Sequence, residues 1–268
     1  MISAALPADL DLTGRTALVT GCGSPTGIGF ATAQALAERG ARVIMTATTD
    51  RIELRAEELR TSGHQAHGVV GRLETEEAAH EVLEAIREKG GSPDILVNNA
   101  GMVSIGEEMP RGDLDMSLDD WRGTVDVNLT SVFLVTRAVI AGMRERGWGR
   151  VITVASTTGA VQATRDDLGY ATAKAGTLGF TRALAVDEAR HGITVNAVAP
   201  GWIATGSQLA QEADEGGLVP MGRSGTPAEV ASAIAWLASP GASYVTGQLI
   251  VIDGGNSVAE ERRVGLYA

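Results

Sequence analysis

The sequence has 268 residues, of which 44% are hydrophobic and 21% charged, and its formal net charge is −11. This acidic balance disfavours nucleic acids and anionic membranes as partners, because both are negatively charged. It contains no uncharged apolar run of about 18 residues and no secretory leader pattern, so we expect a cytoplasmic protein without a membrane span. The length predicts one domain over 1–268, with a core at about 11–255 and a tail at 256–268.

Short apolar runs rich in β-branched residues recur along the chain and predict strands. Between most of them lie alanine- and leucine-rich segments with helical spacing, of which 30–40 and 75–90 are the clearest. This alternation predicts an α/β fold, a Rossmann-type doubly wound parallel sheet of about seven strands with helices on both faces. Gly40, Gly90 and Gly192 are expected to end helices. The predicted strands are 16–20, 41–46, 67–70, 94–100, 150–156, 193–200 and 247–253.

A glycine-rich segment, TGCGSPTGIG at 20–29, lies between the first predicted strand and the first predicted helix. An ordinary turn between a strand and a helix needs one glycine, and this segment has four, so we predict a loop that holds a pyrophosphate at the helix N-terminus. Gly21 would form the turn, Gly27 would let the backbone approach the phosphates, and Gly29 would allow the helix to pack closely on the strand.

The end of the second predicted strand indicates which nucleotide is bound. A carboxylate there would accept the ribose 2′-hydroxyl of NAD, whereas this chain has Ala47. The hydroxyls of Thr48 and Thr49 and the guanidinium of Arg51 offer donors for a 2′-phosphate. We therefore predict that NADP(H) is preferred and that NAD(H) is possible. The alternative for Arg51 is a solvated side chain at a helix start.

Two polar motifs predict a reacting centre at the carboxyl edge of the sheet. In YATAK, Tyr170 and Lys174 are four residues apart and therefore share one helix face. A tyrosine normally titrates near pH 10, and a neighbouring cation lowers its pKa. Ser156, or its neighbour Thr157, ends the fifth predicted strand, where its hydroxyl can donate to a carbonyl oxygen. Tyr170 would then deliver the proton as negative charge grows on that oxygen.

Together with NNAG at 98–101 and APGWIAT at 199–205, these motifs resemble the short-chain dehydrogenase/reductase family, from about Asp11 to Gly255. The resemblance implies hydride transfer between a nicotinamide and a ketone or secondary alcohol. It also implies a homotetramer. The implied catalytic residues are Asn128, Ser156, Tyr170 and Lys174, with Lys174 also binding the nicotinamide ribose and Asn128 holding a water that connects Lys174 to solvent.

The chain departs from the family pattern in three places. The glycine loop is longer by two residues, the segment between Ser156 and Tyr170 is longer by one, and Arg72 stands where relatives carry an aspartate that reaches the adenine. The Arg72 guanidinium would stack against the base or, as the alternative, point to solvent. Within APGWIAT, the resemblance assigns Ile203 and Thr205 to the carboxamide and the phosphate. The predicted cofactor-binding residues are Gly21, Ser24, Thr26, Gly27, Ile28, Thr48, Arg51, Arg72, Leu73, Asn99, Ala100, Gly101, Tyr170, Lys174, Pro200, Gly201, Ile203 and Thr205.

The substrate is predicted from the charges around the site. The nearest subgroup is the 3-oxoacyl-carrier-protein reductases, which carry basic residues where this chain has Gly147 and His191. An acidic chain without them should bind an acidic carrier protein poorly, so we expect a free small-molecule carbonyl or alcohol substrate. Carrier-linked substrates are the alternative, since Arg144, Arg146, Arg150 and Arg190 offer compensating charge. A nucleotide sensor is disfavoured, because such proteins typically lack the tyrosine or the lysine.

The remaining predictions concern mobile segments, metals and the single cysteine. The segments 102–118 and 205–225 lack helical periodicity, and we expect 205–225 to form a mobile lid over the substrate. Trp202, Met221 and Met109 are candidate pocket residues, with ordinary packing as the alternative. The four histidines lack metal-ligand spacing, so no metal is expected. The only cysteine, Cys22, excludes an internal disulfide. It is expected to be a small residue that fits beside the phosphates, and the alternative is that its oxidation there impedes cofactor binding.

Overall fold

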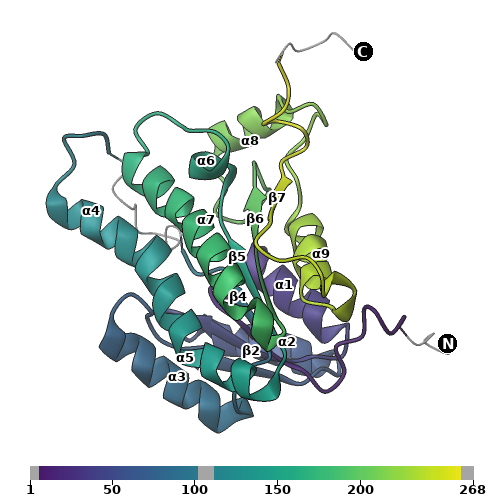
Figure 1. The fold of residues 1–268 in the computed structure, drawn as a ribbon. Helices are drawn as coiled ribbons and strands as arrows, with labels where there is room; N and C mark the ends of the chain where they lie inside the picture. Colours follow the sequence, from purple (N-terminus) through teal and green to yellow (C-terminus); the bar gives the residue numbers. More distant parts are fainter. Residues whose placement is uncertain (1–5, 102–111, 261–268) are drawn as a thin grey trace.

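The protein forms one seven-stranded parallel sheet in the order β3-β2-β1-β4-β5-β6-β7, as seen in a computed structural model that describes residues 6–101 and 112–260 (Figure 1). The strand order reverses between β1 and β4, and in such sheets a crevice opens at the carboxyl ends of the strands at this point. The strands are β1 (Thr16–Val19), β2 (Arg42–Ala47), β3 (Ala66–Val70), β4 (Ile95–Asn98), β5 (Gly149–Val154), β6 (Ile193–Pro200) and β7 (Leu249–Ile252).

Helices cover both faces of this sheet (Figure 1). On one face, α1 (Ile28–Ala37), α2 (Arg51–Thr61) and α9 (Pro227–Leu237) enclose one apolar cluster. On the other face, α3 (Glu76–Gly90), α5 (Ser131–Arg146) and α7 (Leu168–Glu188) enclose a second cluster. The remaining helices are α4 (Leu118–Val125), η1 (Asp126–Thr130), α6 (Thr157–Ala160), η2 (Ala189–His191), α8 (Ala210–Gly217) and η3 (Pro240–Ala242). The α/β doubly wound fold predicted from the sequence is therefore confirmed.

The seven predicted strands are present, and most of the differences are at their ends. The fourth strand was predicted to run to residue 100 but ends at Asn98, because the next backbone N–H groups bond to a side chain of another loop instead of a neighbouring strand. Gly40 and Gly192 follow helices with φ of 92° and 71°. The prediction for Gly90 was wrong by one residue: Gly90 is the last residue of α3, and Gly91, at φ 77°, ends the helix.

Two segments between strands contain helices that bear on the sequence expectations. The continuous helix over 118–146 is long and apolar enough, by length and composition only, to cross a membrane, a test that a buried core helix also meets. Most of its buried apolar residues pack into the core on the sheet, which explains the apolar composition. The segment 205–225 contains the helix α8, although its sequence lacks clear periodicity. Part of the other irregular segment, including Met109, lies outside the described residues.

Candidate active site

Thr20 and Asn99 join the loops that follow β1 and β4 at the switch point. The Thr20 hydroxyl oxygen accepts from the backbone N–H groups of Asn99 (3.0 Å) and Ala100 (2.8 Å). In return, the Asn99 side-chain amide donates to the carbonyl oxygens of Thr20 (2.9 Å) and Gly21 (3.0 Å). Four hydrogen bonds thus fix the glycine loop against the NNAG loop. The Asn99 side chain, which was predicted to bind the cofactor, therefore holds the glycine loop in place. Thr20 supports the same loop and was missed by the sequence reasoning.

The glycine loop is packed so tightly that Gly21 and Gly29 have no room for a side chain. A Cβ atom on Gly29 would lie 2.5 Å from the Gly21 carbonyl oxygen, and one on Gly21, at φ 73°, would lie 2.9 Å from Ala100 Cα. Gly27 caps α1 and, because glycine has no side chain, makes no side-chain cap hydrogen bond to this helix end. A backbone cradle next to an uncapped helix N-terminus fits the pyrophosphate of a dinucleotide. The residues present therefore fit the implied cofactor.

The part of the glycine loop between Gly21 and Gly27 contacts two neighbouring segments. A Cβ on Gly23 would lie 3.1 Å from the Ala47 side chain at the end of β2, and one on Gly206 would lie 2.5 Å from the Thr26 hydroxyl. The loop therefore bridges the end of β2 and the segment after β6. Cys22 is fully buried within it, and burial raises the pKa of its thiol. Because thiolates are the reactive species, this environment favours the interpretation of Cys22 as a small residue that fits the loop over the alternative of oxidation.

The residues predicted to bind the adenosine half of the cofactor lie at the ends of β2 and β3. Arg51 begins α2, and its Nε donates to the Thr49 hydroxyl at 3.1 Å, which holds the guanidinium beside the Thr48–Thr49 pair. Arg72 is exposed and pairs with Glu74 at 3.0 Å. Leu73 is buried, with 6% of its surface exposed. Sequence reasoning did not consider Glu74.

Asn128 lies in a π-helical turn, η1, between α4 and α5. It is almost completely buried, and its side-chain amide donates to the Thr124 carbonyl at 3.0 Å. A π-helical turn places an extra residue in a helix and redirects the side chains around it, which is why such turns are frequent at functional sites. The sequence predicted a helix around Asn128 but gave no signal for this local change.

Lys174 is buried close to Tyr170. Its Nζ lies 5.6 Å from the centre of the Tyr170 ring and donates to the Val154 carbonyl at 3.1 Å. Burial lowers the pKa of Lys174 to about 8, because the charged form is poorly solvated. A Cβ on Gly101 would lie 3.0 Å from Asn128 Oδ1 and 3.2 Å from Lys174 Nζ. Residues from three separate elements therefore converge at one point.

Ser156 lies two residues after the end of β5 in an extended conformation, and its hydroxyl oxygen accepts from the Thr158 N–H at 3.2 Å. Its neighbour Thr157 is buried, and the Thr157 hydroxyl accepts from Gln162 at 3.1 Å. Because the Thr157 hydroxyl is buried and already bonded, Ser156, which is partly exposed, is favoured over Thr157 as the residue that faces the crevice. Gly159 then holds this loop against α7, since a Cβ there would lie 2.1 Å from the Ala171 carbonyl oxygen, next to Tyr170.

The segment after β6 reaches the same edge of the sheet. Pro200 ends β6, and the Gly201 N–H donates to the Ile252 carbonyl at 3.0 Å. Ile203 is buried, whereas Thr205 is partly exposed and shares a hydrogen bond of 3.1 Å with Ser207. The predicted nicotinamide-side residues therefore form a loop that begins at the sheet and leads into α8.

Comparison with known proteins identifies the family. A family sequence model described as enoyl-(acyl carrier protein) reductase matches residues 21–257. The chain belongs to the short-chain dehydrogenase/reductase family. It is 40% identical to the 3-oxoacyl-acyl-carrier-protein reductase FabG of Vibrio cholerae, over 92% of this chain and 98% of that protein. It is also 38% identical to the oxidoreductase UcpA of Escherichia coli, over 95% and 99% of the two chains.

A solved structure supports the same assignment. The gluconate 5-dehydrogenase of Burkholderia cenocepacia, in complex with NADP and tartrate, aligns with a TM-score of 0.84 and 32% identity, covering 94% of this chain and 98% of that one. The fold and the catalytic chemistry of the chain are therefore those of a short-chain dehydrogenase/reductase, an oxidoreductase that uses a nicotinamide dinucleotide to interconvert carbonyl and alcohol groups.

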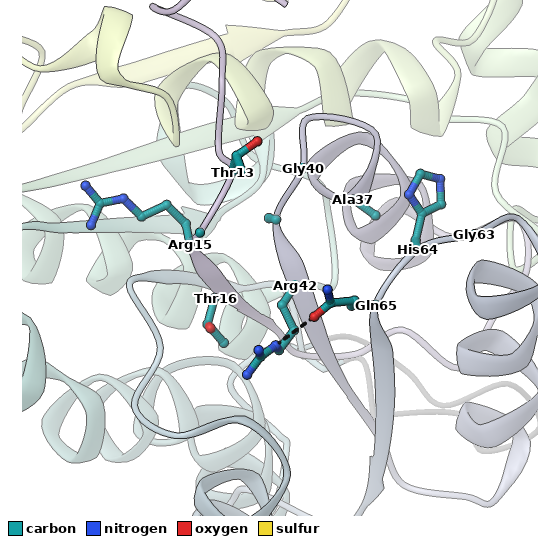
Figure 2. Close-up of a pocket in the computed structure, with 11 residues that line it drawn as sticks. Thr13, Arg15, Thr16, Ala37, Gly40, Arg42, Gly63, His64 and Gln65 are labelled. Atoms are coloured by element: carbon teal, nitrogen blue, oxygen red, sulfur yellow. Dashed lines mark hydrogen bonds between the residues drawn. The ribbon is translucent and has the colours of Figure 1, made fainter. Parts of the chain in front are cut away.

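A cavity of about 280 Å³ lies at the opposite, amino edge of the sheet, away from the short-chain dehydrogenase/reductase site. It is lined by residues at the starts of β1 and β2 and by the segment before β3. Figure 2 shows that the side chains of Arg15, Arg42 and His64 point in different directions around it. Because these basic side chains do not converge, this cavity does not compete with the carboxyl edge as the catalytic site.

Proposed function

We propose that the protein is an NADP(H)-preferring carbonyl reductase, acting reversibly as an alcohol dehydrogenase on free small ketones or hydroxy compounds. The observation that carries this proposal is the convergence of Asn128 and Lys174 on Gly101, with the Tyr170 ring beside the Lys174 ammonium. These groups lie at the carboxyl edge of the sheet, where the glycine loop also lies. A proton donor and a dinucleotide cradle therefore share one crevice.

The proposed roles follow from charge and burial. The bound cofactor supplies the hydride. Lys174 carries a cation close to Tyr170 and favours the phenolate, which makes the phenol acidic enough to give its proton to the substrate oxygen. The Ser156 hydroxyl donates to the same oxygen as negative charge develops there. Asn128 holds a water next to Lys174, through which the proton is replaced from solvent.

NADP(H) is proposed as the preferred cofactor because the end of β2 has no carboxylate to repel a 2′-phosphate. Ala47 occupies that position, and Thr48, Thr49 and Arg51 follow it with hydroxyl and guanidinium donors. The gluconate 5-dehydrogenase neighbour is described with NADP, and an actinorhodin polyketide ketoreductase neighbour with NADPH. NAD(H) is the alternative, and the ratio of KM values for NADPH and NADH distinguishes them.

The second candidate function is reduction of a 3-oxoacyl group linked to a carrier protein. The FabG relatives favour it. Two of the arginines that could bind an acidic carrier already pair with carboxylates of the protein: Arg144 pairs with Glu188, and Arg146 donates to Asp94 at 2.9 Å. Arg150 is buried, and burial lowers its pKa to about 10. Of these four arginines, Arg190 is the exposed one for which the described residues show no ion pair, since Arg150 is buried and bonds to backbone carbonyls. A single available arginine favours a free substrate.

Three further assignments belong to this proposal. The chain forms a single domain over 1–268, and the segment 205–225, which carries α8 and the exposed Met221, covers the substrate. The family resemblance assigns a homotetramer. A cytoplasmic location fits the FabG-like relatives and the acidic composition.

The experiment is a cofactor-oxidation screen with the purified protein. NADPH consumption is measured with small ketones, a 3-oxoacyl thioester of coenzyme A and the same thioester on a carrier protein. We expect turnover of free ketones that Tyr170→Phe lowers by at least about 100-fold, because the phenol supplies the proton. Preference for the carrier-linked thioester would establish the second candidate instead. Cofactor binding without turnover of any substrate would indicate a nucleotide sensor.

A further inference from the structure

Thr124 is a buried residue near the end of α4, one helical turn before Asn128. Its carbonyl oxygen accepts from the Asn128 side-chain amide at 3.0 Å. A carbonyl can only accept, so the NH₂ group of Asn128 must face Thr124 and the Oδ1 atom must face the other way. That Oδ1 atom lies 3.0 Å from the Cβ position of Gly101. Thr124 therefore fixes the direction in which the Asn128 amide points.

The side chain of Thr124 contacts a second element, the first turn of α7. A Cβ atom on Gly169 would lie 3.3 Å from Thr124 Cγ2 and 3.5 Å from Thr124 Cβ. Gly169 is buried and directly precedes Tyr170. The methyl group of Thr124 thus packs where a side chain of residue 169 would begin. One residue therefore contacts both Asn128 and the turn that carries Tyr170.

Two other contacts hold the first turn of α7 against the segment before α4. The Leu168 N–H donates to the Gly112 carbonyl at 3.2 Å, and a Cβ atom on Gly169 would lie 3.2 Å from Met116 Cε. A methionine side chain has three rotatable bonds and adapts to its neighbours. A β-branched threonine in a helix has few χ1 rotamers. Thr124 is therefore the stiffer of the two side chains that face Gly169.

The hydroxyl group of Thr124 is buried and has no hydrogen-bond partner among the described residues 6–101 and 112–260. Burying a hydroxyl without a partner costs free energy, and valine has the same shape without this cost. The methyl group and the carbonyl oxygen, by contrast, both contact the site. This difference allows the roles of the methyl group and the hydroxyl to be separated by substitution.

We propose that Thr124 is a positioning residue of the reaction: it sets the separation between Asn128 and Tyr170 by binding the amide of one and packing against the turn that carries the other. This inference rests on the proposed function, because it assumes that these two residues act in proton transfer. Proton transfer needs donor and acceptor atoms about 3 Å apart, so a small shift of the turn lowers the rate. Thr124 acts through its two neighbours and needs no contact with substrate or cofactor.

The first experiment measures kcat for ketone reduction, the Kd for NADP⁺ and the melting temperature of the full chain. Thr124→Ser removes the methyl group and should lower kcat about fivefold, because the first turn of α7 loses its stiff contact. Thr124→Val keeps the methyl group and should retain kcat within about twofold. The Kd for NADP⁺ should change by less than about threefold in both variants, because the glycine loop lies on another element.

A second pair of variants tests the contact itself. Gly169→Ala places a methyl group 3.3 Å from Thr124 Cγ2 and should lower kcat about tenfold, because the crowded contact displaces Tyr170. Adding Thr124→Ser to Gly169→Ala moves the methyl group from one helix to the other and should restore kcat to within about threefold of the wild type. Gly123→Ala is the matched control and should keep the wild-type kcat, since Gly123 is exposed in α4 and has an open Cβ position.

A purely structural role for Thr124 makes different predictions. Thr124→Ser would then lower the melting temperature but leave kcat unchanged, and this result overturns the inference. Equal losses of kcat in Thr124→Ser and Thr124→Val overturn it in favour of a role for the hydroxyl. A double variant no more active than Gly169→Ala alone also overturns it. In these cases the wild type still reduces ketones and the proposed function stands, whereas a wild type without any NADPH-dependent turnover overturns both.

Discussion

Gly101 approaches Lys174 so closely that a Cβ on Gly101 would lie 3.2 Å from the Lys174 Nζ. The φ of Gly101 is 136°, a value that residues other than glycine rarely adopt. The loop after β4 can therefore cover the lysine only with a glycine at this position. The same point lies 3.0 Å from Asn128 Oδ1, so this glycine approaches two of the proposed catalytic residues.

Gly101→Ala should lower kcat for ketone reduction by about 10- to 100-fold, because the added methyl group displaces Asn128 or Lys174 from the proton path. Steady-state kinetics with NADPH measure the effect. Gly63→Ala is the control, since Gly63 has φ of 87° and no atom within 4 Å of its Cβ position. Equal kcat values for Gly101→Ala and the wild type would show that the contact does not matter for catalysis.

The pH dependence of reduction should report Lys174. Burial lowers the pKa of this ammonium to about 8, so it is charged below that pH and neutral above it. When the cation is lost, the pKa of Tyr170 rises and the phenol becomes a weaker acid. We expect kcat/KM for ketone reduction to fall as pH rises through about 8, since kcat/KM reports groups of the free enzyme. A profile that stays flat up to pH 10 would contradict this assignment.

Gly159→Ala should displace the first turn of α7 and with it Tyr170. The added Cβ would lie 2.1 Å from the Ala171 carbonyl oxygen, at φ of 85°, and we expect a loss of about 2–4 kcal/mol of stability together with most of the activity. Gly91→Ala separates the clash from backbone strain, because Gly91 has φ of 77° and an open Cβ position. Denaturant unfolding and turnover are measured for both variants. Similar losses in the two variants would exclude the clash as the cause.

Arg144→Met should destabilise the fold through Glu188. The Glu188 side chain is 1% exposed, and its hydrogen bond from Arg144 lowers the pKa of the carboxyl group. Since Arg144 is 47% exposed, we expect a loss of about 2 kcal/mol at pH 7, less than for a fully buried pair.

The pH dependence of this loss has a definite sign. The folded-state pKa of Glu188 lies below its ordinary value, so the pair stabilises the protein above that ordinary value and the effect disappears as pH falls through the lower one. The difference between Arg144→Met and the wild type should therefore shrink on acidification. Arg122→Met, which breaks a pair with the exposed Asp119, is the control and should change stability by less than about 0.5 kcal/mol. An equal loss in both variants would show that burial of Glu188 is unimportant.

Much of the fold was predictable because local patterns of apolar and polar residues in the sequence determine its helices and strands. Apolar runs of β-branched residues correspond to the seven strands, since a strand of a parallel sheet is buried on both faces and its composition shows it. The spacing of Tyr170 and Lys174 predicted their proximity, because residues four apart on a helix are neighbours whatever surrounds them. The position of the glycine loop followed from the same reasoning.

The tertiary structure decided what depends on packing between distant segments. The convergence of Gly101, Asn128 and Lys174, the π-helical turn at Asn128, and the burial that shifts the pKa values of Cys22 and Lys174 follow from no local spacing. The tertiary structure also decided which arginines are available to bind an acidic partner. Arg144, for example, pairs with Glu188, which is far away in the sequence. Local sequence determines which element forms, whereas desolvation and contacts between elements exist only once the layers have packed.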